Sequence, residues 1–223
     1  MWQDEVDGIR AILRRIGHSS QTSDKFQDDV LRFIAENHAS GGSIIEIGCY
    51  HGGFTAQLAC LARTFGLQFD VIDIDRANLK MAAHAVAMNG LASHARFHKM
   101  DFAKFVRRSR NPARPVLVFV DGDHRYQGVV ADIKAIRSMA QRPFACAFHD
   151  FSLRYADGPL TIVRVDRAIF DMFGADVALT PVGEIAGQGA TLRTVPEADR
   201  HFHQPGQPEG VIVRLESLSD IRG

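Results

Sequence analysis

Short apolar segments alternate with helix-like segments along most of this chain, and that alternation restricts the folds open to it. Apolar runs predict strands at 43–48, 67–74, 95–99, 115–120 and 143–148. Helical spacing between these runs predicts helices at 54–65, 76–88, 101–108 and 126–140. Strands this apolar are typical of a parallel sheet buried on both faces and joined by right-handed crossovers. We therefore expect a doubly wound α/β fold with helices on both faces of a mainly parallel sheet.

The segments on either side of this core have different patterns. An amphipathic helix is predicted from Ser23, which can cap it, to about His38. After Asp150 the periodicity weakens and predicts a helix at 161–173, strands at 176–180 and 210–215, and a loop at 183–207. We expect the last strand to pair antiparallel. The length favours one domain over residues 1–223, in which a helical lead-in at 1–40 precedes an α/β core at 41–223.

Charge and cysteine content narrow the function classes. The chain has 26 basic and 26 acidic residues, so no overall field attracts nucleic acid or an anionic membrane, and a small-molecule acceptor is favoured. Its 3 cysteines lack metal-finger spacing, which is typical of a reducing compartment. The acidic N-terminus does not resemble a signal peptide, and no window of about eighteen apolar residues occurs. A cytoplasmic protein is expected, and the pattern leaves a homo-oligomer open.

A glycine-rich turn follows the first predicted strand. It contains Glu46, Gly48, Tyr50, Gly52 and Gly53. Glycine lets a chain bend sharply as it leaves a buried strand and lets a ligand approach the backbone. A tight turn without any ligand explains the glycines equally well. The GxxxGG interval differs from the GxGxxG pattern of dinucleotide enzymes, so NAD is disfavoured.

Acidic residues follow the next two predicted strands. Asp73 ends the second strand, where a carboxylate can accept hydrogen bonds from ribose hydroxyls. Asp75 suits a helix cap better, because a predicted helix begins directly after it. Asp101 and Phe102 follow the third strand, where an acid and a ring can hydrogen-bond and stack on adenine, although Asp101 can equally cap a helix.

The glycine turn and these acids, in this order, resemble class I S-adenosylmethionine-dependent methyltransferases over about residues 44–150. The resemblance implies a Rossmann-like methyltransferase fold. It also implies that the turn cradles the methionine part of S-adenosylmethionine, that Asp73 binds ribose and that Asp101 meets adenine. The cofactor-binding candidates are therefore Glu46, Gly48, Tyr50, Gly52, Gly53, Asp73, Asp101 and Phe102.

Two further acidic clusters follow the fourth and fifth strands. Asp121 and Asp123 follow the fourth strand, and His149 and Asp150 follow the fifth. Neighbouring carboxylates repel one another unless a cation lies between them, and such oxygen ligands suit magnesium. Alternatively, Asp123 caps the next helix and Asp150 begins a loop. Two histidines at 201 and 203 lack a paired third ligand, so we leave them out of the site.

The sequences IIEIGCYHGG, VDGDHRY and HDF narrow the resemblance to metal-dependent small-molecule O-methyltransferases allied to macrolide-sugar methyltransferases and the cephalosporin-hydroxylase-like group. This resemblance implies that Asp121 and Asp150 bind a divalent ion. His149 occupies the third ligand position, where relatives often have Asp or Glu, and imidazole also tolerates zinc, manganese or iron. His124 is the candidate general base, with Asp123 as the alternative.

These observations predict methyl transfer to a hydroxyl, with a sugar or phenol of a small molecule or glycan as the acceptor that the resemblance implies. Two other functions stay open. One is a metal-independent methyltransferase that acts on protein or RNA. The other is a relative that binds the cofactor without transferring a methyl group, because a fold does not by itself determine a reaction.

Overall fold

A computed structural model describes residues 2–109, 113–155, 163–189, 192–194, 201–216 and 221–222. Parts of two sequence predictions lie outside these residues: the start of the helix expected at 161–173, and positions 190, 191 and 195–200 of the loop expected at 183–207. All the candidate site residues are described.

Within the described ranges, one sheet has seven strands in the order β3-β2-β1-β4-β5-β9-β7. The strands β1 to β5 are parallel to one another, whereas β9 is antiparallel to both β5 and β7. This topology confirms the mainly parallel sheet and the antiparallel last strand. The strands are β1 Ser43–Ile47, β2 Gln68–Asp73, β3 Arg96–Lys99, β4 Pro115–Val120, β5 Ala145–Phe148, β7 Leu179–Ile185 and β9 Pro208–Arg214.

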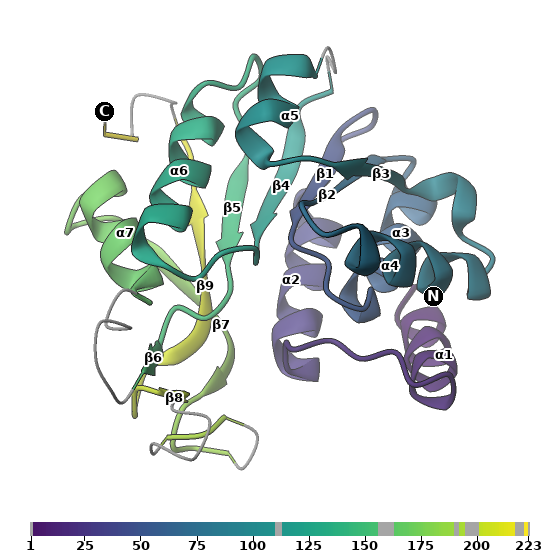
Figure 1. The fold of residues 1–223 in the computed structure, drawn as a ribbon, viewed down its shortest axis with the longest axis horizontal. Helices are drawn as coiled ribbons and strands as arrows, with labels where there is room; N and C mark the ends of the chain where they lie inside the picture. The colour runs from purple at the N-terminus through teal and green to yellow at the C-terminus, as the bar shows by residue number, and fades with distance from the viewer. Residues whose placement is uncertain are drawn as a thin grey trace.

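Helices cover both faces of this sheet (Figure 1). Successive strand residues point to opposite faces, so Ile44 packs with one apolar cluster and Ile45 with the other. The first cluster includes α1 Trp2–Arg15, α2 Asp24–Asn37, α3 Gly53–Phe65 and α4 Arg76–Met88. The second includes α5 Phe102–Arg108, α6 Tyr126–Arg137 and α7 Val165–Phe173. Most of these helices bury one apolar stripe, whereas α3 is buried on all sides from Gly53 to Ala62 because α1, α2 and α4 also pack against it.

The elements that differ from the sequence prediction lie at the two ends of the chain. Helix α1 lies in the helical lead-in expected at 1–40, but its bounds were not predicted; its apolar stripe of Val6, Ile9 and Leu13 is buried in the cluster that contains α3. The loop prediction for 183–207 was wrong at its end, because β8 His201–His203 pairs with β6 Leu153–Tyr155. Three-residue strands have too little periodicity to be predicted, and only a partner distant in sequence stabilises them. Strand β7 begins at Leu179 and extends to Ile185, beyond the predicted 176–180.

The topology places the carboxyl ends of β1 to β5 at one edge of the sheet. Ligands in doubly wound folds bind at this edge. No helix in the described ranges has the length and apolar character needed to cross a membrane.

Candidate active site

The glycine turn between β1 and α3 lets two other parts of the backbone approach closely. Gly48 has φ of 82°, and a Cβ atom there would lie 2.4 Å from the carbonyl oxygen of Asp121. A Cβ atom on Gly53 would lie 2.6 Å from the backbone of Ser19 and Ser20, in the segment between α1 and α2. Tyr50 also has a positive φ, of 43°, which is uncommon outside glycine. These glycines are therefore required by packing, whether or not a ligand is bound.

A cavity of about 560 Å³ lies at the carboxyl edge of the sheet. It contacts the ends of β1, β2 and β4, the start of α5 and one face of α6. Of the cofactor candidates, Glu46, Gly52 and Gly53 are not among the residues that line it. Those that do line it are Gly48, Tyr50, Asp73, Asp101 and Phe102.

Asp73 lies at the end of β2 with its carboxylate held toward the glycine turn. It is 8% exposed, and it accepts hydrogen bonds from the backbone N–H of Cys49 at 3.2 Å and of Asp75 at 2.7 Å. The amide Nδ2 of Asn78 lies 3.4 Å from the same carboxylate. A carboxylate has about four acceptor positions, so these contacts orient Asp73 and leave capacity for a ligand hydroxyl. Asp75 caps α4 by accepting from Ala77 N at 2.7 Å, as predicted.

Asp101 and Phe102 both take part in local structure. Asp101 caps α5, because its Oδ1 accepts a hydrogen bond from the backbone N–H of Lys104 at 2.7 Å. Phe102 is only 2% exposed, and its ring stacks with that of Phe105 at 6.2 Å between centroids. The ring therefore forms part of the cavity wall and is packed into the core rather than standing free.

Glu46 lies beneath the turn and is 1% exposed. Its Oε2 has no hydrogen-bond partner in the described chain. Burial, together with the nearby charges of Asp121 and Asp73, raises the pKa of Glu46 well above its ordinary value. Protonation of this side chain is therefore easier than that of an exposed glutamate.

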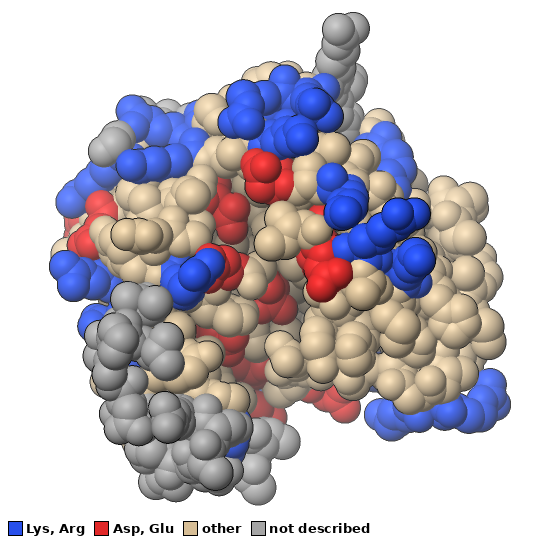
Figure 2. Space-filling model, in the orientation of Figure 1, with Lys and Arg blue, Asp and Glu red and all other residues tan. Residues whose placement is uncertain are grey.

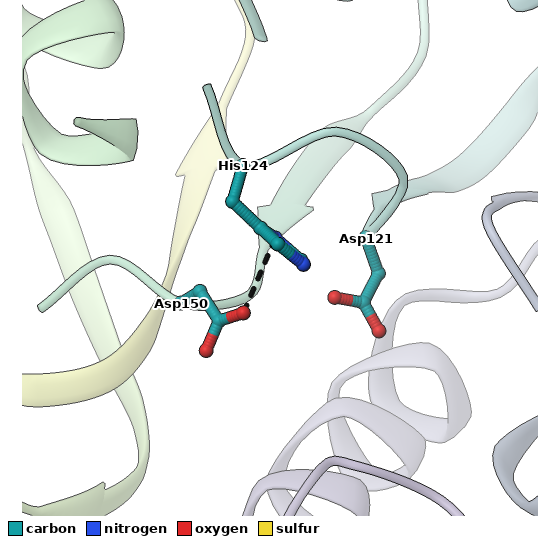
Figure 3. A group of neighbouring side chains, drawn as sticks. All are labelled: Asp121, His124 and Asp150. Atoms are coloured by element: carbon teal, nitrogen blue, oxygen red, sulfur yellow. Dashed lines mark ion pairs between the residues drawn. The ribbon is translucent and has the colours of Figure 1, made fainter. Parts of the chain in front are cut away.

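Asp121, His124 and Asp150 converge at the ends of β4 and β5 (Figure 3). One ligand atom of each lies within 4.8 Å of the others, and Nδ1 of His124 is 3.2 Å from Oδ2 of Asp150. Asp150 has φ of 55°, a strained value for a residue other than glycine, and such strain is common at functional sites. Two carboxylates and one imidazole form a donor set that fits a divalent cation.

His149, which the resemblance implies as the third metal ligand, lies between two carboxylates. Its Nδ1 is 2.9 Å from Asp121 Oδ1, its Nε2 is 3.1 Å from Glu209 Oε1, and its side chain is 4% exposed. Burial opposes protonation, but the charges of Asp150 and Asp121 outweigh it and raise the pKa of His149 well above its ordinary value. Both ring nitrogens of His149 therefore face carboxylates, and the metal-ligand role that the resemblance implies for it stays a prediction. The described contacts bring His124 to the two aspartates instead.

Glu209 was not identified from the sequence. It is fully buried on β9 and accepts hydrogen bonds from the backbone N–H of Ser23 at 2.8 Å and of Glu184 at 3.1 Å, as well as from the Ser23 hydroxyl. Burial would raise its pKa, but the hydrogen bond and charge of His149 lower it below the ordinary value. A single Glu in a C-terminal strand carries no motif, so only its tertiary partners reveal its role.

Asp123, the alternative base, is engaged by Arg125. The guanidinium lies 2.8 Å from Oδ1 and 2.6 Å from Oδ2, and the backbone N–H of Arg125 also donates to Oδ1 at 3.0 Å. These contacts lower the pKa of Asp123. A carboxylate stabilised in its ionised form is a poor proton acceptor, so the geometry favours His124 over Asp123 as a base.

Charge is distributed unevenly around the cavity. Acidic side chains follow the groove in Figure 2, whereas lysine and arginine lie around its rim. The carboxylates that line it are Asp73, Asp75, Asp101, Asp121, Asp123 and Asp132. Asp132, on α6, was not identified from the sequence. Burial, with the charges of Asp123 and Asp101, raises its pKa to about 7. Such a field favours a ligand with positive charge.

Comparison with solved structures shows the same fold in several methyltransferases. The protein is similar to an O-methyltransferase from Bacillus cereus in complex with SAH, with a TM-score of 0.63, 12% identity, and coverage of 95% of this chain and 91% of that one. It is also similar to the O-methyltransferase TomG from Streptomyces achromogenes in complex with SAM, with a TM-score of 0.59, 16% identity, and coverage of 96% and 89%. A candidate O-methyltransferase from Klebsiella pneumoniae gives a TM-score of 0.66 at 13% identity, with coverage of 96% and 90%.

At these identities the likeness shows the fold alone. Among curated proteins, none matches this sequence. The family model described as "Methyltransferase domain" matches residues 45–151, the part of the chain that contains the glycine turn, Asp73 and the clusters after β4 and β5. Residues 45–151 therefore match a methyltransferase domain, and the whole chain has the fold of the O-methyltransferases compared above.

Proposed function

We propose that this protein transfers the methyl group of S-adenosylmethionine to a hydroxyl oxygen of a small molecule or glycan, with a divalent cation bound by Asp121 and Asp150. The observation that carries the proposal is the convergence of Asp121, His124 and Asp150 beside the cavity that begins at the glycine turn. The O-methyltransferases with the same fold support oxygen as the acceptor atom.

The two aspartates supply hard oxygen ligands, which suit magnesium or manganese. When bound, such an ion would lower the pKa of the acceptor hydroxyl and orient its oxygen. The residues of the chain bind and orient the cofactor. The turn and Asp73 hold the cofactor so that its sulfonium faces the strand ends, and the cavity wall excludes water around the reacting atoms.

His124 is proposed as the general base. Its Nδ1 lies 3.2 Å from Asp150, which fixes the ring and, by accepting the Nδ1 proton, leaves Nε2 as the proton acceptor. The acceptor hydroxyl gives its proton to Nε2 as its oxygen attacks the methyl carbon. The carbon–sulfur bond breaks, its electrons return to sulfur, and the products are a methyl ether and S-adenosylhomocysteine.

Calorimetric titration of the metal-stripped protein with S-adenosylmethionine tests the cofactor part of this proposal. Binding in the micromolar range, about −8 kcal/mol, is expected. When the titration is repeated with magnesium present, additional heat would indicate binding at the candidate metal site of Asp121 and Asp150. Absence of cofactor binding under both conditions would overturn the proposal. Full methyl transfer in the presence of a chelator would instead favour the metal-independent alternative.

A further inference from the structure

One carboxyl group in the cavity has no partner in the described chain. Asp132 lies on α6 and lines the cavity, yet the described residues offer it no hydrogen bond or ion pair. The other cavity carboxylates differ in this respect. Asp73 and Asp75 accept backbone N–H groups, Asp101 caps α5, and Asp123 pairs with Arg125.

The strand order indicates the direction in which a bound cofactor would extend. Asp150 follows β5, the glycine turn follows β1, Asp73 follows β2 and Asp101 follows β3. A cofactor with its methyl group near Asp150 and its ribose at Asp73 must extend its base toward β3. There the cavity contacts Met100 and Phe102, and α5 packs against α6 across from them. The face that α6 turns to this space is made by Gly128, Ala131 and Asp132.

The walls at this end are otherwise mostly apolar. Ile74, Met100, Phe102 and Ala131 can contact the faces of a purine but cannot distinguish one purine from another. Discrimination requires a polar group directed at the edge of the base. The 6-amino group of adenine donates hydrogen bonds, whereas a 6-oxo group accepts them. An ionised carboxyl group can only accept hydrogen bonds, so it binds the 6-amino group and repels the 6-oxo group.

Two carboxyl groups lie near this edge, and the structure distinguishes them. Asp101 is exposed and its Oδ1 is committed to Lys104 N. Asp132 is more buried and uncommitted, and burial with the charges of Asp123 and Asp101 raises its pKa to about 7. A hydrogen bond made by a partly desolvated group contributes more to affinity than one made by a hydrated group.

We infer that the Asp132 carboxyl group accepts a hydrogen bond from the 6-amino group of adenine and thereby selects an adenosine-containing cofactor over its 6-oxopurine counterpart. The inference rests on the proposed function for the direction in which the cofactor lies. It adds a specificity-determining residue on α6, outside the glycine turn and the strand-end acids.

The test compares two ligands by calorimetry at pH 8: S-adenosylhomocysteine and S-inosylhomocysteine, which differ at the 6-position of the purine. The wild-type protein is expected to prefer the adenosine ligand by at least about tenfold. Asp132→Ala should lower the affinity for the adenosine ligand by about tenfold, and the affinity for the inosine ligand should stay the same or rise. Asp132→Asn keeps an acceptor oxygen, so its preference for the adenosine ligand should lie between those of the wild-type protein and Asp132→Ala.

Two further variants make the outcome specific. Lys134→Ala changes an exposed residue on the same helix and should leave both affinities unchanged. Asp101→Ala tests the competing carboxyl group and should keep the preference. Equal weakening of both ligands by Asp132→Ala, or loss of the preference in Asp101→Ala alone, would overturn the inference. Failure of the wild-type protein to bind S-adenosylhomocysteine would instead overturn the proposed function.

Discussion

Nε2 of His149 lies 3.1 Å from Oε1 of Glu209, and the two side chains are 4% and 0% exposed. This buried ion pair joins the end of β5 to β9, and through Nδ1 the same imidazole reaches Asp121. Glu209 also holds the N-cap residue Ser23 of α2. Glu209 therefore connects the candidate metal site to helix α2, although the metal-site residues, α2 and Glu209 lie in three separate parts of the sequence.

Removing Glu209 should destabilise the protein strongly. Glu209→Ala leaves a buried imidazolium without one of its carboxylates, and we expect the free energy of unfolding to fall by about 3–5 kcal/mol. Urea denaturation at pH 7 measures this loss. The double variant His149→Leu with Glu209→Leu removes both charges and should recover much of it. A loss below about 1 kcal/mol in Glu209→Ala would show that the pair is not formed in solution.

Asp132 should cost stability at neutral and higher pH. The folded protein keeps its proton up to pH about 7, whereas the unfolded chain releases it near the ordinary value of 3.8. The folded state therefore binds more protons between these values, and the free energy of unfolding falls as pH rises from about 4 to about 7. Asp132→Asn should remove this loss and be about 2 kcal/mol more stable than wild type at pH 8.

The measurement is urea denaturation of both proteins at pH 5 and pH 8. The difference between them should be much smaller at pH 5, where most of the carboxyl group is protonated. Charges from Asp101 and Asp123 face Asp132 and act in the same direction. An equal difference at both pH values would mean that a change in packing, not ionisation, is responsible.

Gly48→Ala should be far more damaging than a glycine substitution in open space. A Cβ atom at Gly48 would lie 2.4 Å from the Asp121 carbonyl oxygen, so either the turn or the end of β4 must move. Gly66 is a matched control, because it also has a positive φ, of 63°, but a Cβ atom there would meet nothing within 4 Å. Gly66→Ala should lose about 1 kcal/mol of stability. Gly48→Ala should lose several times more and should not bind the cofactor.

Asp73 and Asp121 should have separable roles. Asp73→Ala removes a carboxylate from the cavity beside the glycine turn, and we expect cofactor affinity to fall by about tenfold or more. Asp121→Asn should change cofactor affinity little but should abolish magnesium binding and metal-dependent transfer. Calorimetry with each ligand separates the two. Similar loss of cofactor affinity in both variants would contradict this division.

The variant His124→Ala tests whether His124 acts as the general base or as a metal ligand. If Nε2 accepts the proton, the variant should keep its manganese affinity, measured by electron paramagnetic resonance, and should lose about 10²–10⁴-fold in the rate of transfer. Loss of manganese binding along with activity would instead make His124 the third ligand with Asp121 and Asp150. His124→Gln serves as a control of similar size that cannot accept a proton at neutral pH.

Local patterns were sufficient for most of the fold. Apolar runs such as 115–120 are buried strands because their side chains are apolar on both faces, and that property is visible in the sequence. Helix ends were also predictable, because Ser23 and Asp75 cap helices through contacts two or three residues away. The bounds of helix α1 and the existence of strand β8 were not predicted, because each element is stabilised chiefly by partners far away in the chain.

For the candidate site, too, some features could be predicted from local patterns and others could not. The apolar runs alone show that Asp73, Asp121 and Asp150 follow buried strands, and a parallel sheet brings such strand ends to one edge. The hydrogen-bond and ion-pair partners of each side chain became visible in the folded structure alone. It placed His149 between Asp121 and Glu209, paired Asp123 with Arg125, and gave Asp132 no partner among the described residues. Hydrogen bonds and ion pairs of this kind depend on distances between atoms from different strands, and residue spacing along the chain does not encode those distances.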